Sequence, residues 1–120
     1  RGVACGAGRL RKLTGEELEV AVQGRERPLV IDFYATWCGP CVLMAQELEK
    51  VAEEWGDRVD FVKVDTDEEP DLASQLAIQG LPTLVFLGTS GAPAQRVEGL
   101  LPADTVNTII SDMVAAQPQS

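Results

Sequence analysis

Two cysteines separated by two residues are the side chains best placed to do chemistry in this chain. Cys38 and Cys41 enclose a Gly-Pro pair, between an apolar run at residues 29–35 and a helix-patterned run at residues 42–55. This spacing predicts a dithiol at the point where a buried strand turns into a helix. Free N–H groups and the dipole at a helix N-terminus favour a thiolate, so the pair indicates redox chemistry. A static disulfide bridge or a metal clip are the alternatives.

The numbers of cysteines and histidines exclude several other kinds of catalytic and metal site. The chain has three cysteines and no histidine, which excludes Ser-His and Cys-His catalytic pairs. One C-x-x-C pair supplies too few ligands for structural zinc, so we expect neither a metal site nor a cofactor. The third cysteine, Cys5, is either an incidental exposed thiol or the site of a regulatory or intermolecular disulfide.

Length and charge predict one soluble domain without a nucleic-acid or membrane partner. The chain has 120 residues, 45% of them hydrophobic and 24% charged, with a formal net charge of −9. Such an acidic chain disfavours direct binding to phosphates. Its charge either steers basic protein partners toward it or only keeps it soluble. No apolar run approaches the length of a membrane span.

The elements that must position the dithiol follow in a recognisable order. Thr14 and Glu17 form a capping-box pattern before a first helix, and Pro70 stands where a short later helix begins. The apolar pattern predicts helices at residues 14–24, 42–55, 70–79 and 102–114 and strands at residues 29–35, 59–65, 84–87 and 95–98. A βαβ half followed by a ββα half predicts an α/β fold. Its central mixed sheet has four strands, or five with a short strand at residues 9–12, flanked by four helices.

The N-terminal residues differ from the rest. Residues 1–13 are basic and lack acids, which is typical of the end of a processed targeting peptide or of an artificial chain end. We expect residues 1–8 to be a flexible segment and residues 9–120 to form a single domain, frayed after residue 114.

Four sequence blocks then carry a family resemblance. They are IDFYATWCGPC at residues 31–41, FVKVDTDE at 61–68, GLPTL at 80–84 and VEGLLP at 97–102. On these blocks, from about residue 10 to residue 114, the chain resembles the thioredoxin family, and within it the plastid subtype thioredoxin z. The resemblance implies a thioredoxin fold and a location in the chloroplast stroma, with the nucleoid as a further possibility.

The resemblance also implies roles for the reacting groups. Cys38, at the helix tip where it can be exposed, would attack a target disulfide as a thiolate, and Cys41 would resolve the mixed disulfide. Asp32 is a carboxylate inside an apolar strand, so burial should raise its pKa and make it a proton acceptor for Cys41. The alternative is a structural, hydrogen-bonded aspartate. Lys63 corresponds to a family lysine near that carboxylate; from the residues alone it is equally an ordinary surface lysine.

A docking surface for targets is implied as well. Pro82 matches the family's cis-proline, and the backbone of Leu81 would pair with the target peptide. The flat apolar surface around Cys38 would comprise Trp37, Gly39, Pro40, Gly80, Leu81 and Gly99; for Trp37 a packing role is compatible. Three positions depart from the family pattern, and they put the choice of target in doubt rather than the chemistry: Val42, Gln46 and Glu98.

These observations favour a monomeric reductase of disulfides in target proteins. Its electrons would come from a thioredoxin reductase, ferredoxin-dependent in a plastid, or from another thioredoxin. The alternative is an assembly subunit whose dithiol is dispensable, because thioredoxin z associates with the plastid RNA polymerase complex and with fructokinase-like proteins. A third possibility is an oxidase or isomerase, although the Gly-Pro pair favours reduction.

Overall fold

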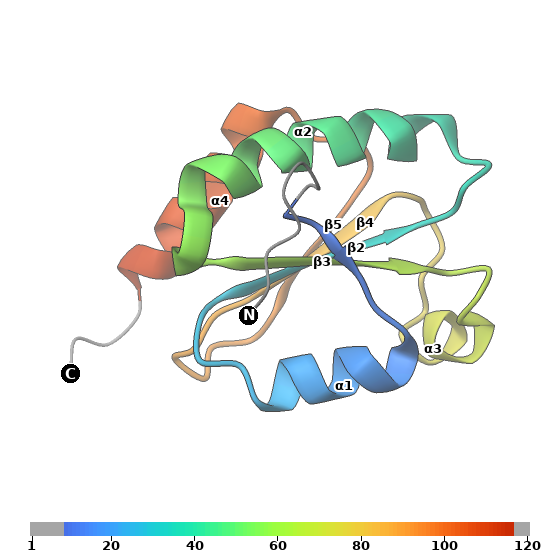
Figure 1. The fold of residues 1–120 in the computed structure, drawn as a ribbon, viewed down its shortest axis with the longest axis horizontal. Helices are drawn as coiled ribbons and strands as arrows, with labels where there is room; N and C mark the ends of the chain where they lie inside the picture. Colours follow the sequence, from blue (N-terminus) through green and yellow to red (C-terminus); the bar gives the residue numbers. More distant parts are fainter. Residues whose placement is uncertain (1–8, 117–120) are drawn as a thin grey trace.

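The central sheet has five strands in a mixed arrangement. The computed structural model describes residues 9–116 and orders the strands β1-β3-β2-β4-β5 (Figure 1). Central strand β2 pairs in parallel with β3 and antiparallel with β4. The strands are β1 (Arg11–Lys12), β2 (Leu29–Tyr34), β3 (Asp60–Asp65), β4 (Thr83–Leu87) and β5 (Gln95–Glu98). The predicted mixed sheet is therefore confirmed, with the short first strand included. Cys5 and the expected flexible segment lie outside the described residues.

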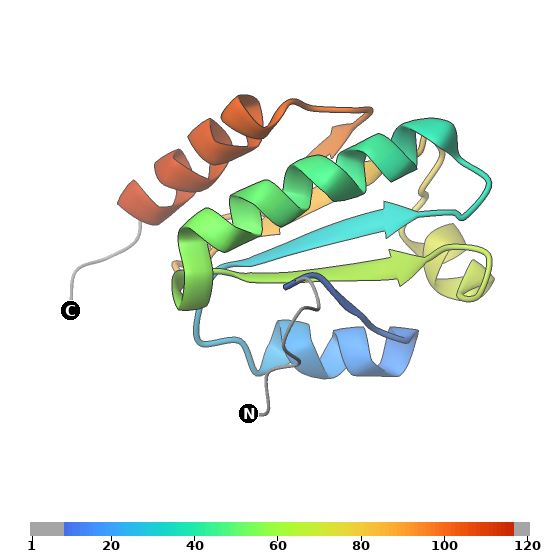
Figure 2. The ribbon, with the colours of Figure 1, turned by 45° about the horizontal axis from the view of Figure 1, so that its top comes forward.

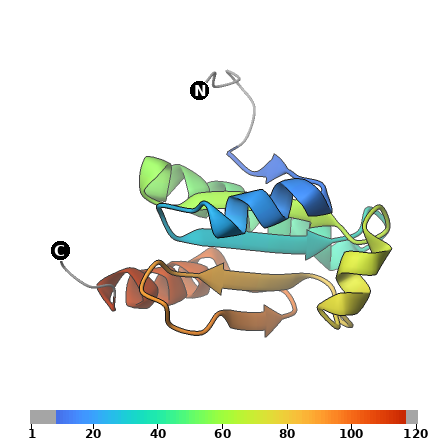
Figure 3. The same cartoon turned by 90° about the horizontal axis from the view of Figure 1, so that it is seen from below.

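Four helices cover the two faces of this sheet. Figure 2 shows α2 and α4 side by side on one face, and Figure 3 shows α1 on the other, with α3 beside the end at which β2 and β3 terminate. The helices are α1 (Gly15–Gln23), α2 (Gly39–Trp55), α3 (Pro70–Gln75) and α4 (Ala103–Ala115). In the described part of the chain, no helix combines the length and apolar character needed to cross a membrane.

Local signals fix where the helices begin and end. The predicted capping box is present: Thr14 Oγ1 accepts from the Glu17 N–H at 3.2 Å, and the Glu17 carboxylate accepts from the Thr14 N–H at 2.9 Å. α3 begins at Pro70, as predicted. α2 ends at Trp55, and the residue that caps it is Gly56, whose φ of +59° favours glycine.

Strand β2 is buried from both sides. Val30 belongs to the core between the sheet and α2 and α4, whereas Ile31 and Phe33 belong to the core on the α1 side. Five of its six residues are buried, because side chains alternate between two covered faces. This packing fixes the carboxyl end of β2, from which residues 35–37 lead directly into α2.

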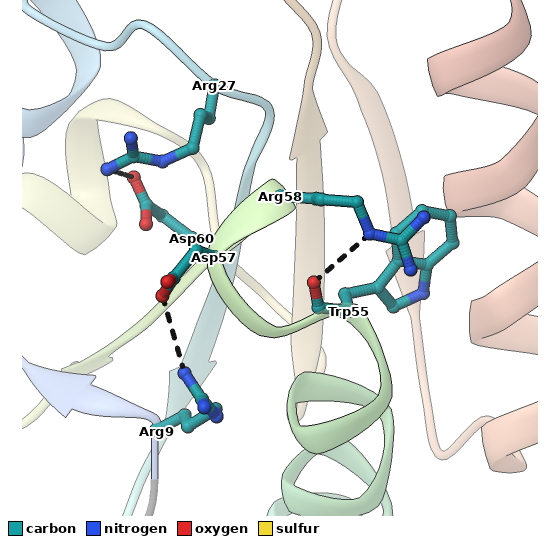
Figure 4. Close-up of polar contacts among 6 residues, drawn as sticks. All are labelled: Arg9, Arg27, Trp55, Asp57, Arg58 and Asp60. Atoms are coloured by element: carbon teal, nitrogen blue, oxygen red, sulfur yellow. Dashed lines mark hydrogen bonds and ion pairs between the residues drawn. The ribbon is translucent and has the colours of Figure 1, made fainter.

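One element was not predicted, the 3₁₀ turn Gly56–Arg58 that joins α2 to β3. Figure 4 shows Arg58 stacked on Trp55, with the guanidinium carbon 4.6 Å from the ring centroid and Nε donating to the Trp55 carbonyl. Ion pairs join Arg9 to Asp57 and Arg27 to Asp60 nearby. A single turn has no apolar period, so the sequence pattern carries no signal for it. This end of α2 lies away from the dithiol.

Core packing of α2 should dominate the stability of the fold. Leu48 is fully buried against the sheet, whereas Leu43 on the same helix is half exposed. We expect Leu48→Ala to lower the free energy of unfolding by about 2–5 kcal/mol, through lost burial and the cavity left behind. Leu43→Ala, the matched control, should change it by less than about 0.5 kcal/mol. Urea denaturation checks both, and equal losses would contradict the assigned packing.

Candidate redox-active site

The two cysteines form a disulfide at the N-terminus of α2. Cys38 is the N-cap residue, and its Cα lies 5.2 Å from that of Cys41. The backbone N–H of Cys41 donates to the Cys38 sulfur at 3.2 Å. This N–H and the α2 dipole act on the first sulfur, so they would favour a thiolate there after reduction. The predicted dithiol at a strand-to-helix turn is confirmed.

Cys38 is less exposed than its place at the helix tip suggested. Only 6% of its surface and 3% of that of Cys41 are accessible. The two residues pack with Ala35, Tyr34 and Leu81 in a small cluster of their own. Cys38 lines a neighbouring hollow, from which this residue can be reached.

That hollow, hereafter the groove, is open and has a volume of about 510 Å³. Of the residues predicted for the docking surface, four line it beside Cys38: Trp37, Gly39, Pro40 and Leu81. The predicted residues Gly80, Pro82 and Gly99 are not among its lining residues. Sequence reasoning missed the residues on the far side of the groove: Thr66, Pro70, Ala73, Ile78 and Gln79. A usable signal existed, because the segment after β3 must meet the carboxyl end of its parallel neighbour β2.

The loop before β4 forms the edge of the groove nearest the sulfurs. The Leu81–Pro82 peptide bond is cis, as predicted. The Thr83 hydroxyl donates to the Gly80 carbonyl, and the Gly99 N–H donates to the Pro82 carbonyl at 2.8 Å. Gly99 has a φ of +101°, which favours glycine. Although Gly99 does not line the groove, it therefore holds the loop that does.

Trp37 is exposed, so it is no core residue. It keeps 71% of its surface accessible, and its indole Nε1 donates to Asp67 Oδ2 at 2.8 Å. The Asp67 N–H in turn donates to the buried Asp65 carboxylate at 2.9 Å. These two bonds tie the indole to the turn after β3 and leave an apolar ring facing solvent beside Cys38.

Asp32 lies deep in the sheet, on the face that α2 covers. It is 1% exposed, and within residues 9–116 its Oδ1 has no hydrogen-bond partner. Burial raises its pKa to about 7, and the charge of Lys63 opposes that rise. This upward shift has the direction expected from the sequence, and the role of Asp32, as proton acceptor or as a structural aspartate, stays a prediction.

Lys63 pairs with Asp32 in the register of β2 and β3, and it is half buried. Its Nζ lies 5.5 Å from the centroid of the Tyr34 ring. Because Asp32, Tyr34 and Lys63 share one face of the sheet, the lysine acts on the carboxylate through charge.

The three departures from the family pattern all lie at the surface. Val42 is 54% exposed, and Gln46 is exposed one turn further along α2. The Glu98 carboxylate lies 2.9 Å from the position that a Cβ on Gly80 would occupy. The rim of the site is therefore apolar along α2 and acidic at the end of β5.

The raised pKa of Asp32 has a consequence for stability. Between the ordinary value of 3.8 and about 7, the folded protein binds a proton that the unfolded chain has lost. Stability therefore decreases as the pH rises through this window. We expect Asp32→Asn to be more stable than the parent at about pH 8, on the order of 2–4 kcal/mol, with the gain shrinking toward pH 4.

Urea denaturation across this pH range measures the gain. The exposed Asp112→Asn controls for the loss of one charge and should show little pH dependence. A gain for Asp32→Asn that is the same at every pH would show that the carboxyl does not titrate between the two values.

Comparison with known proteins places these features in a family. The thioredoxin family model matches residues 9–112. The chloroplastic thioredoxin-like protein CITRX of Oryza sativa subsp. indica is 50% identical over 105 residues, and its counterpart in Arabidopsis thaliana is 48% identical. These matches cover 86% of this chain, which spans 56% and 57% of the two relatives.

Solved structures agree with this placement. A crystal structure of chloroplastic thioredoxin z, described as defining a novel type-specific target recognition, matches this chain with 50% sequence identity and a TM-score of 0.88. The match covers 92% of this chain and 98% of the thioredoxin z chain. The structure of oxidised mitochondrial thioredoxin 3 of Saccharomyces cerevisiae matches with 36% sequence identity and a TM-score of 0.73. That match covers 86% of this chain and 94% of the yeast chain. The chloroplast relatives support the predicted plastid location. The chain belongs to the thioredoxin family.

Proposed function

We propose that this protein reduces disulfides in target proteins of the chloroplast stroma. One observation carries the proposal: a dithiol caps α2 at the edge of an open groove lined mainly by apolar and uncharged residues. A static bridge would need no such groove. A metal clip is disfavoured because, within residues 9–116, no group of three or more His, Cys, Asp or Glu side chains could hold a metal ion.

The reaction transfers two electrons from the dithiol to the target. The Cys38 thiolate attacks one sulfur of the target disulfide, that bond breaks, and the first target thiolate leaves. Cys41 then loses its proton and attacks the Cys38 sulfur. The mixed disulfide breaks, the second target thiolate leaves and takes up a proton, and the Cys38–Cys41 disulfide remains.

Asp32 is the proposed acceptor of the Cys41 proton. Its pKa of about 7 lets the buried carboxyl exchange a proton near neutral pH. Its unpartnered Oδ1 is free of competing hydrogen bonds from the described residues. Lys63 limits how far that pKa rises, which keeps part of the carboxyl ionised as a base.

Target binding is proposed to use the groove and its edge. Trp37, Gly39, Pro40 and Leu81 would contact residues beside the target cysteine, and the Leu81 backbone would pair with the target chain. Pro82, Gly80 and Gly99 would hold that backbone in place from behind. After each turnover, a ferredoxin-dependent thioredoxin reductase or another thioredoxin would reduce the disulfide again.

A second candidate function rests on the exposed apolar side chains beside the site. Val42, Leu43 and Leu100 keep 54%, 50% and 44% of their surfaces accessible. Such a surface also suits stable docking. The chain would then serve as an assembly subunit for fructokinase-like proteins or the plastid RNA polymerase complex, with a dispensable dithiol.

Trapping distinguishes the two functions. Cys41→Ser cannot resolve the mixed disulfide, so we expect targets from a stromal extract to remain bound through Cys38 and to be released by dithiothreitol. Cys38→Ser is the matched control and should trap nothing covalently. If Cys41→Ser forms no mixed disulfides while Cys38→Ser still binds its partners, the docking function is correct and the reductase proposal is wrong.

The role of Asp32 predicts a slow second step. We expect Asp32→Asn to slow release of the reduced target by about 10- to 100-fold near neutral pH, because a general base is lost. In the parent protein, the rate should fall as the pH drops below about 7, where the carboxyl becomes protonated. Rapid-quench measurement of the mixed disulfide checks both points. An unchanged rate and pH profile would remove Asp32 from the mechanism.

A further inference from the structure

The side of the groove away from the sulfurs is formed by a short helix and the turn that follows it. Pro70 and Ala73 belong to α3, and Ile78 and Gln79 come after it; all four line the groove. The chain reverses between them at residues 76–80, hereafter the wall segment. Two of its residues, Ile78 and Gln79, line the same groove as Cys38.

The wall segment begins with a strained turn. Ala77 has a φ of +54°, in the left-handed region that glycine normally occupies. The Ile78 N–H donates to the Ala73 carbonyl at 2.9 Å and the Ala77 N–H to the Ser74 carbonyl at 3.0 Å. This is the hydrogen-bond pattern of a Schellman helix end, which favours glycine at the central position. With alanine there, the turn needs support from elsewhere.

Arg96 on β5 supplies that support. Its Nη1 donates to the Leu76 carbonyl at 2.6 Å and its Nη2 to the Ala77 carbonyl at 2.7 Å. Hydrogen bonds from a charged donor are about twice as strong as neutral ones. They also place a cation at the negative end of α3, which has no basic residue in its own last turn. A residue distant in sequence thus completes the end of this helix.

The same strand contacts the other end of the wall segment. Arg96 and Glu98 are two residues apart on β5, so their side chains leave the same face of the sheet. Glu98 Oε1 lies against Gly80, the last residue of the wall segment. β5 therefore binds the first two residues of the wall segment through Arg96 and lies against its last residue, and β5 itself pairs with β4.

We propose that Arg96 is a positioning residue for target binding, which fixes the wall segment and thereby the shape of the groove for extended protein targets. The proposal rests on the reductase function. Arg96 touches neither sulfur, so its effect should appear in the binding of long targets and not in the chemistry of the dithiol. A small disulfide that needs only the Cys38 sulfur should react independently of it.

The test compares a protein disulfide with a small one. We expect Arg96→Met, which removes the donors but keeps the apolar stem, to raise KM for insulin about 5- to 10-fold with little change in kcat. The rate with 5,5′-dithiobis(2-nitrobenzoate) should stay within about twofold of the parent. Arg96→Lys, which keeps the charge and donor groups, should fall between.

A matched control and a rescue make the result specific. Arg58 also donates to carbonyls at a helix end, but at the far end of α2, so Arg58→Met removes the same charge away from the groove (Figure 4). It should leave KM for insulin unchanged. Ala77→Gly relieves the left-handed strain and should restore KM in the Arg96→Met background.

Amide hydrogen exchange provides a readout that needs no turnover. In Arg96→Met, the Ala77 and Ile78 amides should exchange at least about tenfold faster, and Ala77→Gly should reverse this. Unchanged exchange or unchanged KM for insulin in Arg96→Met would overturn the proposal. Should Arg96→Met not fold, a KM for Arg96→Lys equal to that of the parent overturns it. A parent that reduces neither substrate would instead contradict the reductase function.

Discussion

The burial of β2 on both faces is the constraint on which the rest of the site depends. Because helices cover both sides of this strand, its carboxyl end has a fixed position, and α2 must begin there. The helix N-terminus thereby acquires its place beside the loop before β4. The same burial encloses Asp32, which lies in a position where a hydrocarbon would be more stable. One packing arrangement therefore places both the cysteine pair at the start of α2 and the buried carboxyl that we propose as its proton acceptor.

The geometry around the cysteine pair was well predicted from the sequence because it depends on local signals. The C-x-x-C spacing, the apolar run around Asp32 and the GLPTL block each occupy one short stretch, and each has the expected geometry. Periodicity also located every helix and all the longer strands. The ends of the longer strands differed by at most one residue: Ala35 and Val59 are buried but lie outside the strands, and Thr83 belongs to β4.

The groove was poorly predicted because it is assembled from distant segments. Pro70, Ala73 and Ile78 had the pattern of an ordinary helix face and turn, and only the folded sheet brings them beside Trp37. Arg96 is a similar case. On an edge strand it looks like a solvated charge, and nothing in the neighbouring sequence indicates that its partners are carbonyls twenty residues earlier. Interactions between a side chain and a remote backbone leave no periodic trace in a sequence.

The site is divided between the two faces of the sheet. The proposed reaction and the shape of the groove therefore depend on different residues. The groups proposed to transfer electrons and protons lie on or beside the face covered by α2: Cys38, Cys41 and Asp32. The wall segment and Arg96 belong to the opposite face. On the proposed mechanism, substitutions in the wall segment or at Arg96 should change the outline of the groove without changing the reducing power of the dithiol. Such a scaffold can be retargeted by exchanging a short turn and its supporting strand residue, with the reaction itself unchanged.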